Sequence, residues 1–118
     1  MNKFLILSVA VLLGASTSAC GKRCSNDPVT TVPSPSGKNK AVVFHRLCEG
    51  TVPNTQVSVL ASYSELSNIP GNALILDGNV PLQARWTSDT SLTISGLGTA
   101  QVQKPQPSVT DVPITYDQ

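Results

Sequence analysis

The sequence predicts an all-β fold: a small antiparallel sheet or sandwich of six to seven short strands, preceded by a signal-peptide helix and a flexible tether. Three observations indicate this. Apolar and polar residues alternate in short runs, and turn-forming residues recur about every 8–12 residues. The chain is rich in Thr, Ser and Val, with only 13% charged residues. The 118 residues suffice for one domain at most.

The first expected strand covers residues 40–48 and is apolar on both faces. Val42 and Phe44 lie on one face, and Ala41 and Val43 lie on the other. Such a strand is expected to be central and covered on two sides. Further strands are expected at 56–63, 73–76, 82–87, 91–95, 99–103 and 112–116.

Turn signals separate these strands. The Ser34–Lys38 segment combines Pro35 with Gly37 and predicts a tight turn that opens the first strand. Residues 77–79, Asp-Gly-Asn, give the strongest hairpin signal in the chain and predict that 73–76 and 82–87 pair with each other.

Residues 1–19 are predicted to be a signal peptide. Lys3 precedes an unbroken apolar run from Phe4 to Leu13, and small residues follow up to Ala19. The run is shorter than the roughly 20 residues that span a membrane, which disfavours a permanent transmembrane helix. Residues 20–39 are predicted to be a lipid-anchored tether and disulfide arm, since they are proline-rich without an apolar period, and residues 40–118 the β domain.

Residues 17–20, Thr-Ser-Ala-Cys, resemble the bacterial lipobox, in which small residues precede a cysteine that becomes acylated. This resemblance implies lipidation at Cys20. Thr17 departs from the leucine that is usual in that motif, which leaves open an ordinary cleavage after Ala19 or Ala15. Acyl chains on Cys20 would hold the protein on a membrane without any transmembrane segment.

The chain has three cysteines, an odd number for an exported protein. If Cys20 carries lipid, Cys24 and Cys48 remain as a single pair for a disulfide that closes a loop of about 25 residues, worth about 3.5 kcal/mol. Two alternatives remain open: a zinc site formed by the three cysteines with His45, and a catalytic thiol that uses His45 as its partner.

The sequence contains no paired carboxylates, nucleophile elbow, phosphate-binding loop or zinc-protease motif, so no enzymatic activity, cofactor or metal is expected. A hydrolase that uses His45 is a remaining alternative. A formal charge of +1 argues against nucleic-acid binding. The candidate binding residues are Arg46 and Arg85, charges within apolar strands, and Trp86.

The segment from Ser34 to Thr51 resembles a group of small exported bacterial proteins without assigned function. In that group an S-P-D-G-K turn precedes an A-V-V-F-x-R-x-C strand, then C-G-A-T-T and T-x-V-S-I-L. The matching residues here are Ser34, Pro35, Gly37, Lys38, Ala41, Val42, Val43, Phe44, Arg46, Cys48, Thr51, Thr55, Val57, Ser58 and Leu60. Ser36 replaces the usual Asp. A cysteine also precedes the turn in that group, and this likeness implies that Cys24 bonds to Cys48.

The same turn and strand also resemble one blade of a TolB-type β-propeller. A propeller needs four or more blades, so the chain is expected to form a free-standing sheet.

The expected function is that of a non-enzymatic envelope lipoprotein that acts through contacts with an envelope protein or a cell-wall component. Gly21 after the cysteine favours the periplasmic face of the outer membrane, if the cell is Gram-negative. The alternative is a soluble periplasmic or secreted binding or inhibitor module, similar to the small exported inhibitors of lysozyme.

Overall fold

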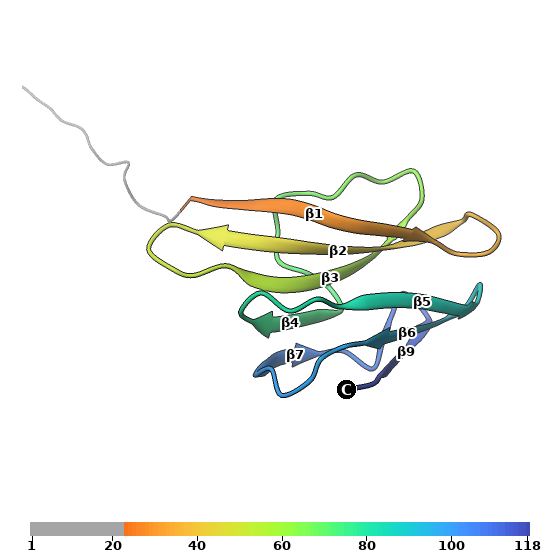
Figure 1. Ribbon diagram of the computed structural model, residues 1–118. Helices are drawn as coiled ribbons and strands as arrows, with labels where there is room; N and C mark the ends of the chain where they lie inside the picture. Colours follow the sequence, from red (N-terminus) through yellow and green to blue (C-terminus); the bar gives the residue numbers. More distant parts are fainter. Residues whose placement is uncertain (1–22) are drawn as a thin grey trace, which may run out of the picture.

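A computed structural model describes residues 23–118, which form two stacked β-sheets (Figure 1). The predicted signal peptide and Cys20 lie outside these residues. The first sheet has the strand order β1-β2-β3-β4-β7, and the second has the order β5-β6-β9-β8. The strands are β1 (Cys24–Pro33), β2 (Asn39–Cys48), β3 (Asn54–Ala61), β4 (Leu74–Asp77), β5 (Gln83–Ser88), β6 (Ser91–Ser95), β7 (Val102–Pro105), β8 (Ser108–Val109) and β9 (Val112–Tyr116). In this part of the chain, no helix is long and apolar enough to cross a membrane.

The predicted all-β class is confirmed for residues 23–118, which form nine strands rather than six or seven. The largest difference concerns residues 24–33, which were expected to be part of a tether and instead form β1, a ten-residue strand paired with β2. β1 is an edge strand that is exposed over most of its length, so it needs no apolar period. Pro28 and Pro33 are tolerated there because an edge strand leaves part of its backbone unpaired, and a register shift falls just after Pro28.

Two pairings also differ from the prediction. β4 and β5 lie in different sheets, so the hairpin expected at residues 77–79 does not form. The chain instead crosses between the sheets, guided by Thr55, whose hydroxyl donates to the Gly78 carbonyl (2.8 Å) and accepts from the Val80 N–H (2.9 Å). In addition, β6 and β9 pair in parallel, so the second sheet is mixed rather than wholly antiparallel.

The core lies between the two sheets. β2 and β3 contribute Ala41, Val43, Val57 and Val59 from the first sheet, which pack with residues of β4. The second sheet and its connections complete the cluster with Leu82, Leu92, Ile94, Leu97, Val112 and Ile114. Within the strands these residues occupy alternate positions, because every second side chain points to the same face of a sheet.

The outer face of β2 is also buried, as its two apolar faces predicted. Val42 and Phe44 are 3% and 0% exposed, yet neither belongs to the cluster between the sheets. Residues 62–73, which connect β3 to β4 and are called the covering loop below, lie over this side of the sheet (Figure 1). Its Gly71 N–H donates to Gln56 Oε1 (2.6 Å), and the Asn72 side chain bonds both backbone groups of Val59 (2.8 and 2.9 Å).

Two aromatic side chains of the second sheet form hydrogen bonds to backbone carbonyls in or next to the first sheet. The Trp86 indole N–H of β5 donates to the Val32 carbonyl of β1 (2.8 Å). The Tyr116 hydroxyl of β9 lies 2.6 Å from the Gln106 carbonyl and 3.0 Å from the Ala73 carbonyl just before β4. Burial raises the pKa of this hydroxyl above its ordinary value. Each contact gives a half-buried aromatic side chain a partner for its polar atom.

A third contact joins two turns. The Ser36 N–H, in the turn between β1 and β2, donates to Asp89 Oδ1 in the turn between β5 and β6 (2.7 Å). This backbone hydrogen bond lowers the pKa of the Asp89 carboxyl, with smaller contributions from the hydroxyls of Ser36 and Ser34 and from the charge of Lys38.

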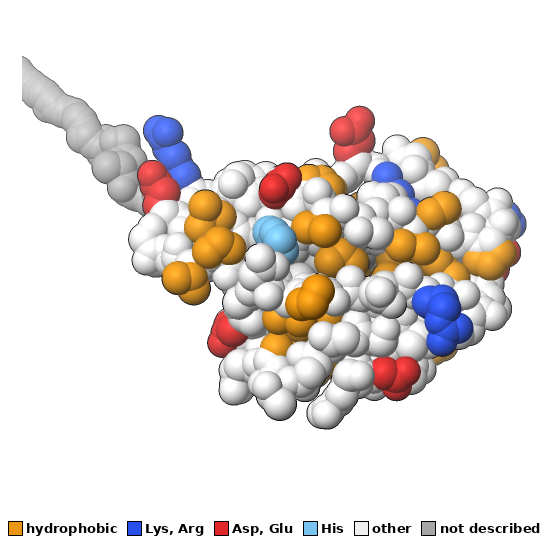
Figure 2. Space-filling view, viewed as in Figure 1, with side chains coloured by type: hydrophobic (Ala, Val, Ile, Leu, Met, Phe, Trp, Pro, Cys, Tyr) orange, Lys and Arg blue, Asp and Glu red, His pale blue; other side chains and the backbone are white. Residues whose placement is uncertain are grey.

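The surface carries few charges and several exposed apolar side chains (Figure 2). The large hydrophobic residues that are exposed in the described part of the chain are Val29, Leu47, Val52, Tyr63 and Ile69.

Candidate functional site

The disulfide between Cys24 and Cys48 confirms the pairing predicted from the sequence. The two residues are direct partners in the β1–β2 register, so the bond ties the first residue of β1 to the last residue of β2. Because both thiols are consumed, neither can act as a zinc ligand or as a nucleophile while the bond is intact. Across residues 23–118, no group of three or more His, Cys, Asp or Glu side chains is placed to hold a metal ion.

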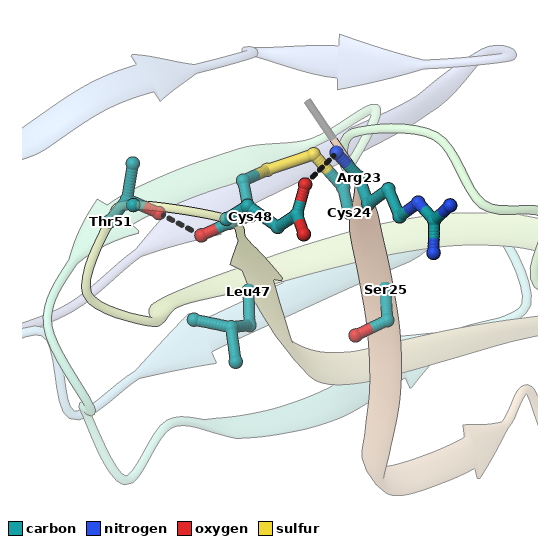
Figure 3. Close-up of a pocket in the computed structure, with 8 residues that line it drawn as sticks. Arg23, Cys24, Ser25, Leu47, Cys48 and Thr51 are labelled. Carbon is teal, nitrogen blue, oxygen red and sulfur yellow. Dashed lines mark hydrogen bonds between the residues drawn. A yellow bond between two sulfur atoms is a disulfide. The ribbon is translucent and has the colours of Figure 1, made fainter. Parts of the chain in front are cut away.

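A pocket of about 390 Å³ surrounds this disulfide (Figure 3). Its walls are residues 23–25 at the start of β1 and residues 47–51 at the end of β2. The Glu49 N–H donates to the Arg23 carbonyl (2.8 Å), and the Arg23 N–H donates to Glu49 Oε1 (3.3 Å). Thr51 closes the turn, since its N–H and its hydroxyl both donate to the Cys48 carbonyl (3.1 and 2.8 Å). These contacts hold the first described residues firmly against the β2–β3 turn.

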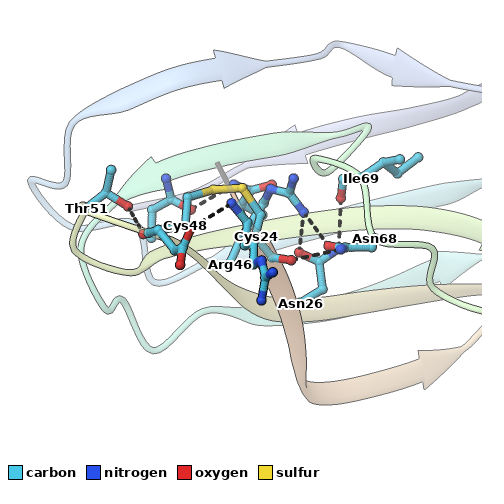
Figure 4. The surroundings of a disulfide bond; sticks show 11 residues. Cys24, Asn26, Arg46, Cys48, Thr51, Asn68 and Ile69 are labelled. Carbon is cyan, nitrogen blue, oxygen red and sulfur yellow. Dashed lines mark hydrogen bonds between the residues drawn. A yellow bond between two sulfur atoms is a disulfide. The ribbon is translucent and has the colours of Figure 1, made fainter. Parts of the chain in front are cut away.

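Arg46, a candidate binding residue, lies beside the disulfide and bonds within the molecule (Figure 4). Its Nη1 donates to Asn26 Oδ1 of β1 (2.8 Å) and to Asn68 Oδ1 of the covering loop (3.1 Å). Asn26 in turn donates to the carbonyls of Ser67 (2.9 Å) and Ile69 (2.8 Å). Asn68 Nδ2 donates to the Cys24 carbonyl (2.8 Å). Arg46 therefore fastens the covering loop to the sheet.

The other two candidates lie in the second sheet and do not join Arg46. Trp86 points inward, packs against the core and bonds Val32. Arg85 is the exposed neighbour of Trp86 on β5 and lines a separate hollow of about 400 Å³ with Thr30 and Val32 of β1. The structure therefore does not gather the three side chains into one binding site.

His45 is half-buried in β2, where its register partners are Asp27 in β1 and Thr55 in β3. It lines a hollow of about 480 Å³ together with Asp27 and Pro53. Cys24 and Cys48 are bonded to each other, so neither supplies the thiol that the nucleophile hypothesis pairs with this histidine, and Cys20 lies outside the described residues.

Four side-chain amides that attach the covering loop were not among the residues predicted to be functional. Asn26, Gln56, Asn68 and Asn72 each bond the covering loop to the sheet or to β1. Asn68 and Asn72 were visible only as residues that interrupt the strand pattern. An asparagine side chain can hydrogen-bond backbone N–H and C=O groups that have no partner in a neighbouring strand. The two asparagines within residues 68–72 were therefore the sequence feature that could have indicated these contacts.

Comparison with protein-family models, with curated proteins and with solved structures finds no match to this chain.

Proposed function

We propose that this chain is an exported, non-enzymatic envelope lipoprotein, anchored through acylated Cys20, whose β-sandwich makes contacts with another envelope protein or with the cell wall. It resides on the envelope membrane, on the periplasmic face of the outer membrane if the cell is Gram-negative.

The observation that supports this proposal is the pairing of the cysteines. Cys24 and Cys48 bond to each other, which leaves Cys20 as the odd cysteine of the three in the chain. An unpaired thiol in an oxidising compartment needs a chemical role. The lipobox-like residues before Cys20 supply one, because acylation consumes that thiol.

The arrangement of the domain is consistent with a contact protein. Arg46, the charged candidate closest to the disulfide, is engaged by Asn26 and Asn68, and the face shown in Figure 2 carries apolar side chains among polar and charged ones. Apolar side chains with polar and charged groups around them are typical of surfaces that recognise another macromolecule.

Metabolic labelling with an alkyne analogue of palmitate tests the proposal. The wild-type chain should incorporate label and be found in the membrane fraction, whereas Cys20→Ala should lose both. The matched control is the double variant Cys24→Ala/Cys48→Ala, which removes two cysteines but should keep its label. Equal labelling of wild type and Cys20→Ala, or no labelling at all, would contradict the anchor and favour a soluble inhibitor or binding module.

A further inference from the structure

The point at which the described chain begins is fixed to one end of the sandwich. The Cys24–Cys48 bond and the reciprocal hydrogen bonds between Arg23 and Glu49 hold the start of β1 against the β2–β3 turn. Arg23, the first described residue, is therefore held at this end of the domain.

This same end carries exposed apolar side chains. Val52 is 77% exposed and Leu47 is 46% exposed, and the exposed Pro53 lines the same hollow as Leu47. Figure 2, viewed as in Figure 1, shows hydrophobic side chains at the end of the molecule where β1 begins. We call Leu47, Val52 and Pro53 the apolar tip. At this end the positive charge of Arg23 is offset by the negative charge of Glu49. The surface is therefore characterised by its exposed apolar side chains and not by a net charge.

Chain length limits how far this end can be from the proposed anchor. Cys24 is four positions after Cys20. Because an extended chain spans at most about 3.6 Å per residue, the two residues are at most about 14 Å apart. The headgroup layer of a bilayer is itself roughly 5–8 Å thick on each side. A domain acylated at Cys20 therefore keeps its disulfide end within about 14 Å of the acylated residue.

We infer that the apolar tip docks on the lipid surface, with Val52 and Leu47 inserted at the boundary between headgroups and acyl chains. The inference rests on the proposed acylation of Cys20. It makes the anchor a two-part contact that orients the sandwich with its disulfide end on the membrane and the Ser34–Lys38 turn pointing away. The β2 strand of ten residues sets a length of about 30 Å between these two ends.

The test uses the full, acylated protein reconstituted in phospholipid vesicles. Val52→Cys introduces a thiol that can be labelled with an environment-sensitive nitrobenzoxadiazole dye, since the native cysteines are acylated or in the disulfide. Tyr63→Cys is the matched control. Tyr63 is 88% exposed, but it lies at the opposite end of β2, because the neighbouring Ser62 N–H donates to the Lys38 carbonyl. Vesicle flotation of the same samples reports the anchor independently.

The expected result is a severalfold rise in emission with a blue shift at position 52, quenched by spin-labelled lipid, and no change at position 63. Proteins that float with the vesicles but show water-exposed dye at position 52 would overturn the inference and leave the anchor intact; position 52 would then be free for a protein partner. Insertion at both positions would overturn the orientation. Failure to acquire lipid and to float would overturn the proposed function and this inference together.

Discussion

Removing the disulfide should destabilise the domain by about 3.5 kcal/mol. Cys24 and Cys48 are 24 residues apart, so the bond closes a loop of 25 residues, counting both cysteines. The chain-entropy model gives a closure entropy of roughly 12 cal/mol/K for a loop of that size, which is about 3.5 kcal/mol at 25 °C. For a domain of this size, that is a large share of the free energy of unfolding.

The measurement is urea unfolding of two soluble proteins, Cys20→Ala and the triple variant Cys20→Ala/Cys24→Ala/Cys48→Ala. Cys20→Ala removes the proposed acylation site from both, so that only the disulfide differs. The unfolding midpoint should fall strongly in the triple variant. The m-value should rise, because an unfolded chain without the cross-link exposes more surface to urea.

Two results would contradict the expected loss of stability. A loss below about 1 kcal/mol would mean that the closed loop constrains the unfolded chain far less than the chain-entropy model requires. A fall in the m-value would indicate that β1 has detached in the native state, so that the hydrogen bonds between β1 and β2 do not hold the edge strand without the covalent bond.

Three further predictions concern single side chains. Arg46→Met should cost about 2 kcal/mol, measured by urea unfolding, because two hydrogen bonds to a charged donor are lost, and hydrogen exchange in the covering loop should rise. Gly71→Ala should cost about 1–3 kcal/mol in the same assay, because a Cβ there would lie 2.7 Å from the Val57 carbonyl oxygen. Asp89→Asn should flatten the acid limb of the stability curve. The Ser36 N–H lowers the carboxyl pKa, so its contribution is present above pH 3.8 and is lost as the pH falls through the folded value.

A specific result would contradict each of these three predictions. If Arg46→Met leaves urea unfolding and hydrogen exchange unchanged, Arg46 does not hold the covering loop in place and is again a candidate binding residue. Gly71→Ala with wild-type stability would show that the covering loop can shift away from β3 without cost. Asp89→Asn with the same dependence of unfolding on pH as the wild type would mean that the turn contact does not form in solution.

The strand alternation predicted most of the first sheet correctly. The run 40–48 is apolar on both faces, and β2 is an interior strand of the sheet, covered on both sides. Ala41 and Val43 lie in the core, and Val42 and Phe44 lie under the covering loop. The predicted disulfide followed from counting cysteines and from a family resemblance, and the structure forms it. These features are local or covalent, so the chain itself carries the information.

The predictions that were wrong concern features that depend on contacts between residues far apart in the chain. β1 has prolines and no apolar face, and only its pairing with β2 makes it a strand. The turn signal at residues 77–78 is genuine, since Gly78 has a positive φ of 84°. However, Thr55 of the adjacent strand β3, 23 residues earlier in the chain, directs the chain across to the other sheet. A turn signal specifies a change of direction and does not specify which strand comes next to pair.

The amino-acid pattern was enough to predict the all-β class and the interior position of β2, because strand periodicity is a property of a few neighbouring residues. Counting the cysteines favoured the Cys24–Cys48 pair, which the structure forms. Tertiary structure alone decided the division into two sheets, the parallel pairing of β6 with β9 and the role of Arg46. That arginine is an isolated charge in the sequence, and it became a fastener because Asn26 and Asn68, 20 and 22 residues away in the chain, supply the oxygens that it needs. A buried or half-buried polar group takes whichever partner the fold brings to it.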